Sequence, residues 1–355
     1  MKGSDFLQKK TVAVVFGGCS PEYGVSLQSS YSILTNLDRE KYTVIPVGIT
    51  QEGEWYRYDG DLENILNDTW SKDKENLTSV VISQNRSIHG MLEFRCGVTF
   101  AVRIDLAFPV LHGKNGEDGT VQGVFETAGI PVVGCGILAS ALCMDKDRAH
   151  KLAESAGAAV PKAVTIRSFE ETDVKKLTEG LKYPLFVKPV KAGSSFGITK
   201  VFEESELEDA VTFAFYYDDT VIVEENIDGF EVGCAVLGTD ELTIGRVDEI
   251  ELQSGFFDFK EKYTLETSKI HMPARIDAET EQRIRDTAAV IYRALGCSGF
   301  ARVDMFLTPD GEIVFNEVNT IPGCTSHSRY PNMMKGIGIE FGELLDRLLG
   351  SYADE

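Results

Sequence analysis

The sequence predicts a mixed α/β and α+β fold, in which a doubly wound parallel-sheet domain precedes two smaller α+β subdomains. Residues 11–16 (TVAVVF) form a continuous apolar run, which is typical of a strand buried in a parallel sheet. Gly17 and Gly18 break that run, and residues 25–37 then have helical spacing, so the chain begins with strand, turn and helix. Residues 299–319 (GFARVDMFLTPDGEIVFNEVN) read as two strands around a turn, which predicts a β-hairpin near the other end.

The first domain is expected to cover residues 1–140. Further strands are predicted at 42–49, 104–111 and 131–134, with a helix between two glycines at 119–129. Residues 51–90 are polar, and we expect them to form an irregular insertion.

The second domain is predicted over residues 141–228 and the third over residues 229–355. The second contains expected strands at 162–166, 184–189, 198–202 and 221–224, and helices at 145–156, 169–180 and 204–216. The third contains expected strands at 230–238 and 242–250, a helix at 278–295, the hairpin and a C-terminal helix at 337–349.

Composition excludes several classes of protein. The net charge of −21 over 355 residues argues against nucleic acid or an anionic membrane as the main partner. The sequence has no apolar run near the ~18 residues that cross a bilayer, and the N-terminus lacks an apolar signal segment. The seven cysteines are dispersed, which is typical of reduced thiols, so a cytoplasmic protein is expected.

The predicted hairpin carries polar residues among apolar neighbours. Glu317 and Asn319 are two residues apart and share one face of their strand, and Asp304 on the partner strand can reach the same side. Three oxygen ligands of this kind suit Mg²⁺, and Arg302 could neutralise a transferring phosphoryl group or an oxyanion. The alternative is a hairpin whose polar face meets solvent.

Two other segments have the chemistry of a nucleotide site. Lys188 at a strand end precedes a small-residue loop whose backbone N–H groups could cradle phosphate, and Lys146 could add a second positive charge. Glu224 and Ile227 could meet an adenine, and Glu231 could take ribose hydroxyls. Taken separately, each segment could instead be an ordinary turn or a solvated acidic strand end. Histidines 89, 150 and 271 have no ligand-like spacing and receive no role.

In this order, the pieces resemble the ATP-grasp superfamily, and three further segments resemble the D-alanine–D-alanine ligases. These segments are residues 16–26 (FGGCSPEYGVS), 112–119 (HGKNGEDG) and 319–328 (NTIPGCTSHS). The resemblance extends from residue 12 to beyond residue 330. It implies an ATP-grasp fold and a homodimer like those of the family. It also implies an enzyme that uses ATP to join two D-amino acids into a cell-wall precursor.

The resemblance also implies roles for individual residues. Glu22 and His112 would bind the first D-alanine, while Ser328 and Arg329 would lie at the second substrate. ATP would contact Lys146, Lys188, Ser195 and Lys262 at its phosphates, and Glu224, Ile227 and Glu231 at its nucleoside. Asp304, Glu317 and Asn319 would bind two Mg²⁺ ions, for which Mn²⁺ could substitute. Arg302 and the Gly323 backbone N–H would stabilise an oxyanion, and Glu22, Ser194 and Tyr263 would be linked when a loop at 257–263 closes.

The second substrate in this family is D-alanine, D-lactate or D-serine. The pair Lys262-Tyr263 argues against D-lactate, because the lactate-forming ligases depart from it. Arg329 stands where dialanine ligases usually carry leucine or methionine, and an arginine there could donate hydrogen bonds to a D-serine hydroxyl. The chain is similar in this respect to the VanG type of vancomycin-resistance D-alanine–D-serine ligase. If the Arg329 side chain turned toward solvent instead, the alternative interpretation would be an ordinary D-alanine–D-alanine ligase.

Two other classes of protein are alternatives to this interpretation. An ATP-grasp ligase for another acid and amine would keep the metal and phosphate residues but would lack the segments at 16–26 and 112–119. A non-catalytic nucleotide-binding protein would not need Arg302 together with the three candidate metal ligands. The sequence does not distinguish bulk cell-wall synthesis from antibiotic resistance.

Overall fold

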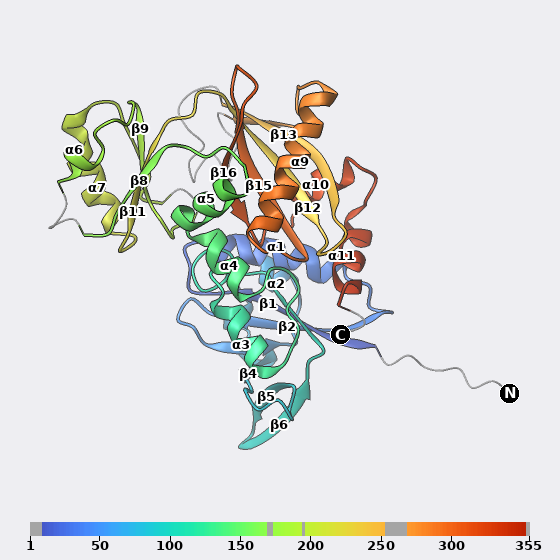
Figure 1. Cartoon of the computed structure of the whole chain (residues 1–355). Helices are drawn as coiled ribbons and strands as arrows, with labels where there is room; N and C mark the ends of the chain where they lie inside the picture. The colour runs from blue at the N-terminus through green and yellow to red at the C-terminus, as the bar shows by residue number, and fades with distance from the viewer. Residues whose placement is uncertain (1–8, 169–172, 194–195, 253–267, 353–355) are drawn as a thin grey trace. The chain divides into compact units, whose positions relative to one another are not determined.

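The computed structural model describes residues 9–168, 173–193, 196–252 and 268–352 (Figure 1). The chain divides into two compact units. The first comprises Met1–Gly134, Gly323–Pro331 and Ile339–Glu355, and the second comprises Cys135–Pro322 and Asn332–Gly338. Segments from both ends of the sequence therefore belong to the first unit. The finer division into 1–140, 141–228 and 229–355 stays a prediction.

The described part of the first unit contains a seven-stranded sheet in the order β6-β5-β4-β3-β2-β1-β7. Its strands are β1 (Lys10–Gly17), β2 (Tyr42–Ile49), β3 (Trp55–Tyr58), β4 (Leu77–Ile82), β5 (Gly90–Arg95), β6 (Val98–Arg103) and β7 (Leu106–Pro109). β1 runs parallel to β2 and β7, whereas the pairs from β2 through β6 are antiparallel. The predicted α/β class is confirmed, with parallel pairing confined to β2, β1 and β7.

The expectation of an irregular insertion at residues 51–90 was wrong. This stretch contains β3 and β4 and begins β5, which extend the sheet by antiparallel pairing. In β4, Val80 and Ile82 are buried while Val81 is exposed, so the apolar signal is spread over only a few alternating positions. The strand predicted at 131–134 is reduced to an isolated bridge between Ala107 and Val132.

Helices of the first unit pack against this sheet and its connections. They are α1 (Tyr23–Asn36), α2 (Glu63–Leu66), α3 (Thr120–Ala128) and α11 (Phe341–Gly350), with short 3₁₀ turns η1 (Trp70–Lys72) and η2 (Lys74–Asn76). Tyr352, just after α11, exchanges hydrogen bonds with the backbone of Gly134 at 2.9 and 3.1 Å, and its carbonyl accepts from Lys10 Nζ at 3.1 Å. The helix α10 (Arg329–Lys335) crosses the boundary between segments of the two units.

The described part of the second unit contains two antiparallel sheets. One has the order β10-β9-β11-β8 and the other β14-β13-β12-β15-β16. The strands are β8 (Ala163–Ile166), β9 (Leu185–Pro189), β10 (Thr199–Val201), β11 (Val221–Glu225), β12 (Phe230–Leu237), β13 (Thr243–Leu252), β14 (Ser268–His271), β15 (Phe300–Leu307) and β16 (Ile313–Asn319). The helices are α4 (Ile137–Met144), α5 (Lys146–Ser155), α6 (Val174–Leu177), α7 (Leu207–Phe215) and α9 (Ala278–Ala294), with the 3₁₀ turn η3 (Glu204–Glu206).

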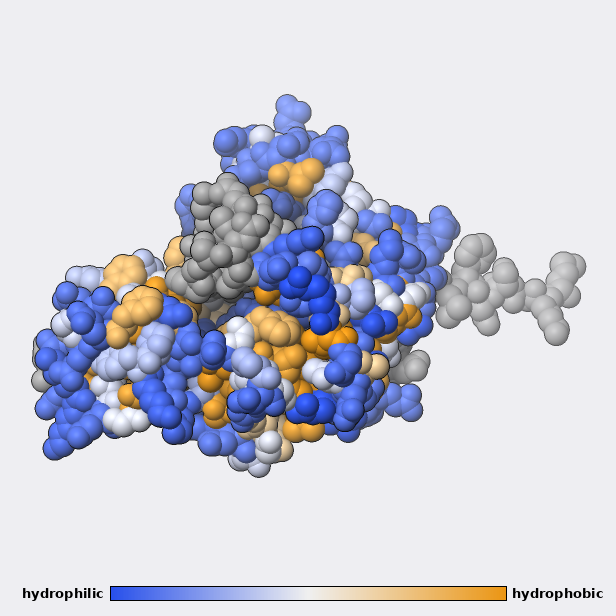
Figure 2. All heavy atoms as spheres, turned by 90° about the horizontal axis from the view of Figure 1, so that it is seen from above, coloured by the Kyte–Doolittle hydropathy of each residue, from blue (hydrophilic) through white to orange (hydrophobic). Residues whose placement is uncertain are grey.

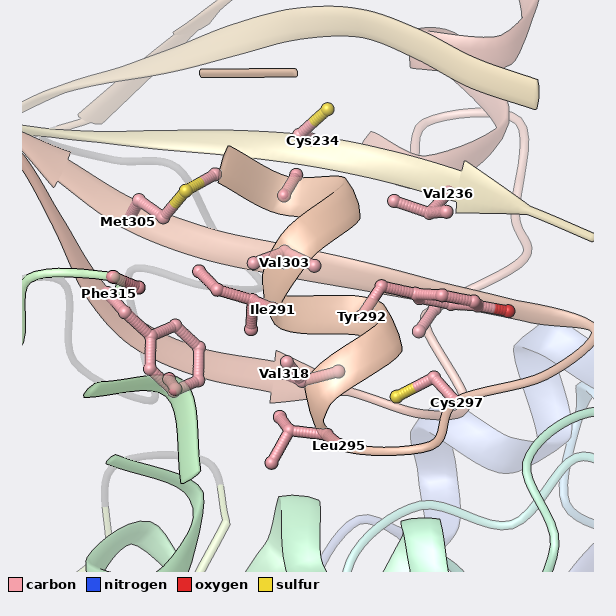
Figure 3. Packing of buried hydrophobic residues seen from close by; sticks show 14 of the residues in the cluster. Cys234, Val236, Ile291, Tyr292, Leu295, Cys297, Val303, Met305, Phe315 and Val318 are labelled. Carbon is pink, nitrogen blue, oxygen red and sulfur yellow. The ribbon is translucent and has the colours of Figure 1, made fainter. Parts of the chain in front are cut away.

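The hairpin predicted at 299–319 is confirmed as β15 and β16, and α9 covers one face of its sheet. Figure 3 shows the α9 side chains facing the inner side chains of the strands, with Ile291, Tyr292 and Leu295 packed against Val303, Met305 and Val318. All of these side chains are at least nine-tenths buried. This core leaves the opposite face of β15 and β16 for the polar residues.

A β-bulge interrupts the pairing of β15 with β16. Asp304 is opposite Glu317 and Met305 is opposite Phe315, so Asn316 is the extra residue on β16. Phe315 and Val318 consequently both face the core although they are three residues apart (Figure 3). Bulges are common beside active sites because they re-aim side chains. This one directs both Asn316 and Glu317 away from the core.

The surface in Figure 2 is mostly hydrophilic, in agreement with the net charge of −21. Within the described ranges, we find no helix with the length and apolar character needed to cross a membrane. All seven cysteines are free thiols. Five of them are buried and Cys19 and Cys96 are exposed, which confirms that most act as small apolar side chains.

Candidate functional site

A pocket of about 470 Å³ lies within the second unit, between the residues of its two sheets. Six of the predicted ATP and metal residues line it: Lys146, Lys188, Glu224, Ile227, Glu231 and Glu317. Its volume is in the range of small-molecule sites, which is about 300–1,000 Å³. Phe186, Ile198 and Phe230 add apolar surface, so the pocket combines flat apolar walls with converging charges.

The two lysines of this pocket are held from different elements. Lys146 is the first residue of α5, whose N-cap Asp145 accepts a hydrogen bond from the Arg148 backbone N–H. Its ammonium donates to the Ala192 carbonyl at 2.8 Å and lies 3.9 Å from a Glu317 carboxylate oxygen. Lys188 projects from β9 and contacts Glu224 at 2.6 Å. Two largely buried ammonium groups at one pocket suit a polyphosphate.

Glu224 is almost completely buried on β11. Burial by itself raises the pKa of this carboxyl, but the neighbouring charges of Lys188, His150 and Lys146 outweigh burial and leave the pKa below its ordinary value. The carboxylate is therefore ionised at neutral pH and is held by its pairing with Lys188.

Replacing Lys188 with methionine is expected to lower the free energy of unfolding by about 3–5 kcal/mol, because it leaves a buried carboxylate without its closest cation. A carboxyl with a depressed pKa stabilises the fold above its unfolded pKa, and this stabilisation is lost as the pH falls through the folded pKa. In the variant the pKa of Glu224 rises, so the loss should be largest near neutral pH and smaller in mildly acidic buffer. Urea unfolding at several pH values measures this.

The control is Lys175→Met. Lys175 also pairs with a carboxylate, that of Glu204, but the two side chains are 47% and 63% exposed. A solvent-exposed pair is worth about 0–1 kcal/mol, so this variant should remain close to the parent protein. Equal effects of the two substitutions would contradict the importance of the buried pair.

The hairpin places the predicted metal and oxyanion residues on one face. Asp304 is opposite Glu317, and Arg302 is opposite Asn319. Arg302 donates two hydrogen bonds to Asp304, at 2.8 and 2.6 Å, and Asn319 Nδ2 donates to the same carboxylate at 2.9 Å. The fork of two bonds fixes the plane of the guanidinium.

The donor set of this face fits a hard divalent cation. Among the residues that the structure describes, no three His, Cys, Asp or Glu side chains are grouped to hold a metal ion. The hairpin instead offers the two carboxylates of Asp304 and Glu317 and the amide of Asn319. Mg²⁺ is usually held by one or two carboxylates and completes its shell with phosphate oxygens and water, so this set is sufficient.

The predicted residues of the first unit form a separate group. Glu22 is the N-cap of α1 and is mostly buried. Its backbone N–H donates to Ser20 Oγ at 3.1 Å, and that hydroxyl donates to the His112 carbonyl at 2.6 Å. The chain turns beside Glu22 at Gly113, where φ is +71° and a Cβ would lie 2.3 Å from a Glu22 carboxylate oxygen. Glycine is required there for both reasons.

Ser29 on α1 joins this group to the segment 323–329. The His112 ring contacts Ser29 Oγ at 3.3 Å, and the backbone N–H of Cys324 donates to the same hydroxyl at 3.3 Å. In the following turn, Ser328 Oγ accepts from the Thr325 backbone N–H at 3.0 Å. Gly323 lies beside that hydroxyl, because a Cβ on Gly323 would come within 3.0 Å of Ser328 Oγ. Arg329 follows at the start of α10 and is only 9% exposed.

Four predicted residues lie outside the described part of the chain. They are Ser194, Ser195, Lys262 and Tyr263, together with the predicted loop at 257–263.

Sequence reasoning missed several residues of these two groups. Phe186 could have been found, because it lies two residues before Lys188 and so shares the face of that strand. His150 was given no role, yet its ring lies 3.6 Å from Glu224 inside the second unit. Ser20 and Ser29 carried no sequence signal beyond being small polar residues.

Comparison with known proteins agrees with this arrangement. The family description "D-ala D-ala ligase N-terminus" matches residues 11–135, and "D-ala D-ala ligase C-terminus" matches residues 152–350. The crystal structure of the VanG D-Ala:D-Ser ligase from Enterococcus faecalis is 65% identical, with a TM-score of 0.91, and the match covers 97% of this chain and 100% of that one.

Two relatives with other names share less sequence identity with this chain. The vancomycin C-type resistance protein VanC1 of Enterococcus gallinarum is 44% identical over 96% of this chain and 97% of its own length. A putative D-alanine–D-lactate ligase of Streptomyces coelicolor is 46% identical over 95% and 96%, respectively. Because the two family descriptions together span most of the sequence, the chain belongs to the D-alanine–D-alanine ligase family of ATP-dependent ligases.

Proposed function

We propose that this ligase joins D-alanine to D-serine and releases ADP and phosphate. The observation that carries the proposal is the similarity to the VanG D-Ala:D-Ser ligase, at 65% identity over 97% of the chain. The buried Arg329 supports it, because a guanidinium beside the second substrate can donate a hydrogen bond to it. A D-serine hydroxyl accepts such a hydrogen bond, whereas the methyl group of D-alanine does not.

In the proposed reaction, the carboxylate of D-alanine attacks the γ-phosphorus of ATP and forms an acyl phosphate. The Glu22 carboxylate would hold the ammonium of this D-alanine beside His112. Lys146 and Lys188 would bind the phosphates, and Glu224, Ile227 and Glu231 would bind the nucleoside in the pocket. Phe186 and Ile198 offer the apolar walls that a purine needs.

The second amino acid then attacks the acyl phosphate through its amine, and phosphate leaves from a tetrahedral intermediate. Arg302, with its plane fixed by Asp304, and the Gly323 backbone N–H would stabilise the oxyanion. Two Mg²⁺ ions bound by Asp304, Glu317 and Asn319 would neutralise phosphate charge, and Mn²⁺ could replace them. The roles proposed for Ser194, Ser195, Lys262 and Tyr263 are those that the family resemblance implies.

Product identification tests the proposal. The purified protein is incubated with ATP, Mg²⁺ and D-alanine, alone or with D-serine or D-lactate, and phosphate release and product mass are recorded. Predominantly D-alanyl-D-serine is the expected result. D-alanyl-D-alanine alone would support the alternative, a housekeeping dialanine ligase. A depsipeptide with D-lactate would overturn the reading of Lys262-Tyr263, and the absence of any product would point to another acid and amine.

Replacing Arg329 with leucine should shift the preference from D-serine toward D-alanine. A hydrogen bond to a charged group contributes about 1.5–3 kcal/mol, so the ratio of kcat/KM for the two substrates should fall by roughly 10- to 150-fold. The control is Arg347→Leu, which removes a half-exposed arginine on α11. If the ratio is the same in the parent and in Arg329→Leu, Arg329 does not select the second substrate.

Two finer statements complete the proposal. A homodimer is proposed from family resemblance, and sedimentation analysis would test it. A cytoplasmic location is supported by the seven free thiols, because reduced cysteines are typical of that compartment.

A further inference from the structure

We propose that His150 is a positioning residue for ATP, which ties the nucleotide carboxylate Glu224 to the strand that carries the metal ligands. The inference rests on the proposed roles of Glu224 and Lys188 in nucleotide binding. It concerns a histidine that has no contact with the reacting atoms in that proposal and no signal in the sequence.

His150 is fixed between elements of the second unit. It lies on α5, one turn after Lys146 and on the same face of the helix. Its side chain is 6% exposed, and its ring packs edge-on against Phe315, with ring centroids 5.4 Å apart and planes at 73°. A polar ring buried to this extent requires partners for both of its nitrogens.

The first nitrogen binds the bulge on β16. His150 Nε2 lies 2.8 Å from the carbonyl oxygen of Asn316, so this nitrogen carries a proton and donates it to the hydrogen bond. Asn316 is the extra residue of the bulge, and a bulged residue lacks a regular partner in the ladder. The ring therefore supplies a hydrogen bond that holds the backbone immediately before Glu317.

The second nitrogen faces the nucleotide carboxylate. His150 Nδ1 is 3.6 Å from Glu224 Oε1, which is too long for a hydrogen bond, and neither buried atom has another hydrogen-bond partner among the residues that the structure describes. The other oxygen of Glu224 is bonded to Lys188. In the imidazolium form of the ring Nδ1 also carries a proton, and a shift of a few tenths of an ångström would let it donate to the ionised Glu224 carboxylate.

This contact has a use when ATP binds. Lys188 pairs with Glu224, and the same ammonium is proposed to bind phosphate. As phosphate oxygens compete for Lys188, the buried carboxylate needs a second partner, since an unpaired buried charge is costly. His150 is placed to provide this partner. Because it also binds the Asn316 carbonyl, it holds Glu224 at a fixed position relative to Glu317.

The test compares His150→Leu, His150→Gln and the parent protein by ATP affinity. Direct calorimetric titration with ATP in Mg²⁺-containing buffer without amino acids gives the Kd, and steady-state assays give kcat and the KM for ATP. His150→Leu should raise Kd and KM for ATP about tenfold, as expected for one lost buried hydrogen bond, with kcat at saturating ATP within about twofold. His150→Gln, which can still donate to Asn316, should give an intermediate rise.

A double-mutant cycle with Glu224→Gln separates positioning from general stability. In the Glu224→Gln background, His150→Leu should change the ATP Kd by less than about twofold, because the carboxylate charge with which the ring pairs is already removed. His89→Asn is the control: His89 has a φ of +48°, which asparagine tolerates, and it belongs to the first unit. If His150→Leu does not fold, the cycle is run with His150→Gln, whose intermediate effect should likewise vanish.

An unchanged ATP Kd in the His150 variants, or an effect that is equal in both Glu224 backgrounds, would overturn the inference. Failure of the proposed function has a different outcome. If the parent protein forms no dipeptide but binds ATP with the expected dependence on His150, the choice of substrates is wrong and the positioning role stands.

Discussion

Replacing Glu317 with glutamine is expected to lower ATP-dependent phosphate release by at least about 10²–10³-fold. Glu317 is opposite Asp304 in the hairpin, and together they supply the two carboxylates of the candidate metal face. Glutamine keeps the shape and the hydrogen-bonding oxygen but removes the charge that a divalent cation requires. The β-bulge and the core beneath it should be unaffected, because Phe315 and Val318 provide that packing.

Phosphate release at saturating D-alanine and D-serine, titrated with Mg²⁺, measures this effect. The loss should be accompanied by a rise in the Mg²⁺ concentration that gives half-maximal activity. Glu312→Gln is the matched control, since it neutralises an exposed carboxylate on the same hairpin. Turnover that persists at the parent rate in Glu317→Gln would remove the metal assignment.

Replacing Arg302 with lysine should reduce kcat by about 10²–10³-fold and leave the ATP Kd nearly unchanged. Arg302 is held by two hydrogen bonds to Asp304, so its guanidinium is oriented before the reaction begins. A lysine ammonium retains the charge but cannot form the fork, and its position is less well defined. Because an oxyanion exists only during the reaction, the loss should appear in kcat and kcat/KM together.

Stopped-flow phosphate release and calorimetric ATP binding distinguish the two quantities. The control is Arg283→Lys, which changes an exposed arginine on α9 whose guanidinium donates to the Gly311 carbonyl at 2.8 Å. A large loss of ATP affinity in Arg302→Lys, with kcat preserved, would show that Arg302 serves the bound nucleotide and not the reaction's oxyanion.

The hairpin and its polar face could be predicted because charged and amide side chains stand among apolar neighbours there. The bulge could not, since a two-residue alternation would place Phe315 and Glu317 on the same face. Only the packing of Phe315 into the core shows that the alternation of inward and outward side chains shifts by one residue at Asn316. The bidentate contact of Arg302 with Asp304 was also absent from the prediction, although the two residues share a face.

His150 shows why other residues of the site could not be predicted from the sequence. Its partner Asn316 is 166 residues away, and it contacts a carbonyl oxygen, which every residue possesses. A single histidine in a helix therefore carries no local signal. The strands between residues 51 and 90 were missed for a different reason: in β4, only Val80 and Ile82 are buried, so the alternation that marks a half-buried strand is short.

The first unit includes α11 and Tyr352 although its sheet is formed by residues before 135. Tyr352 binds the backbone of Gly134 and Lys10 Nζ, so the earliest and latest parts of the described chain meet in one unit. Protein synthesis proceeds from the N-terminus, and domains generally fold as they emerge from the ribosome. All strands of the first unit are therefore translated before the second unit, but α11 and Tyr352 follow only after nearly all of it. A chain truncated before α11 would have the complete sheet but would lack the helix and the tyrosine that complete the first unit.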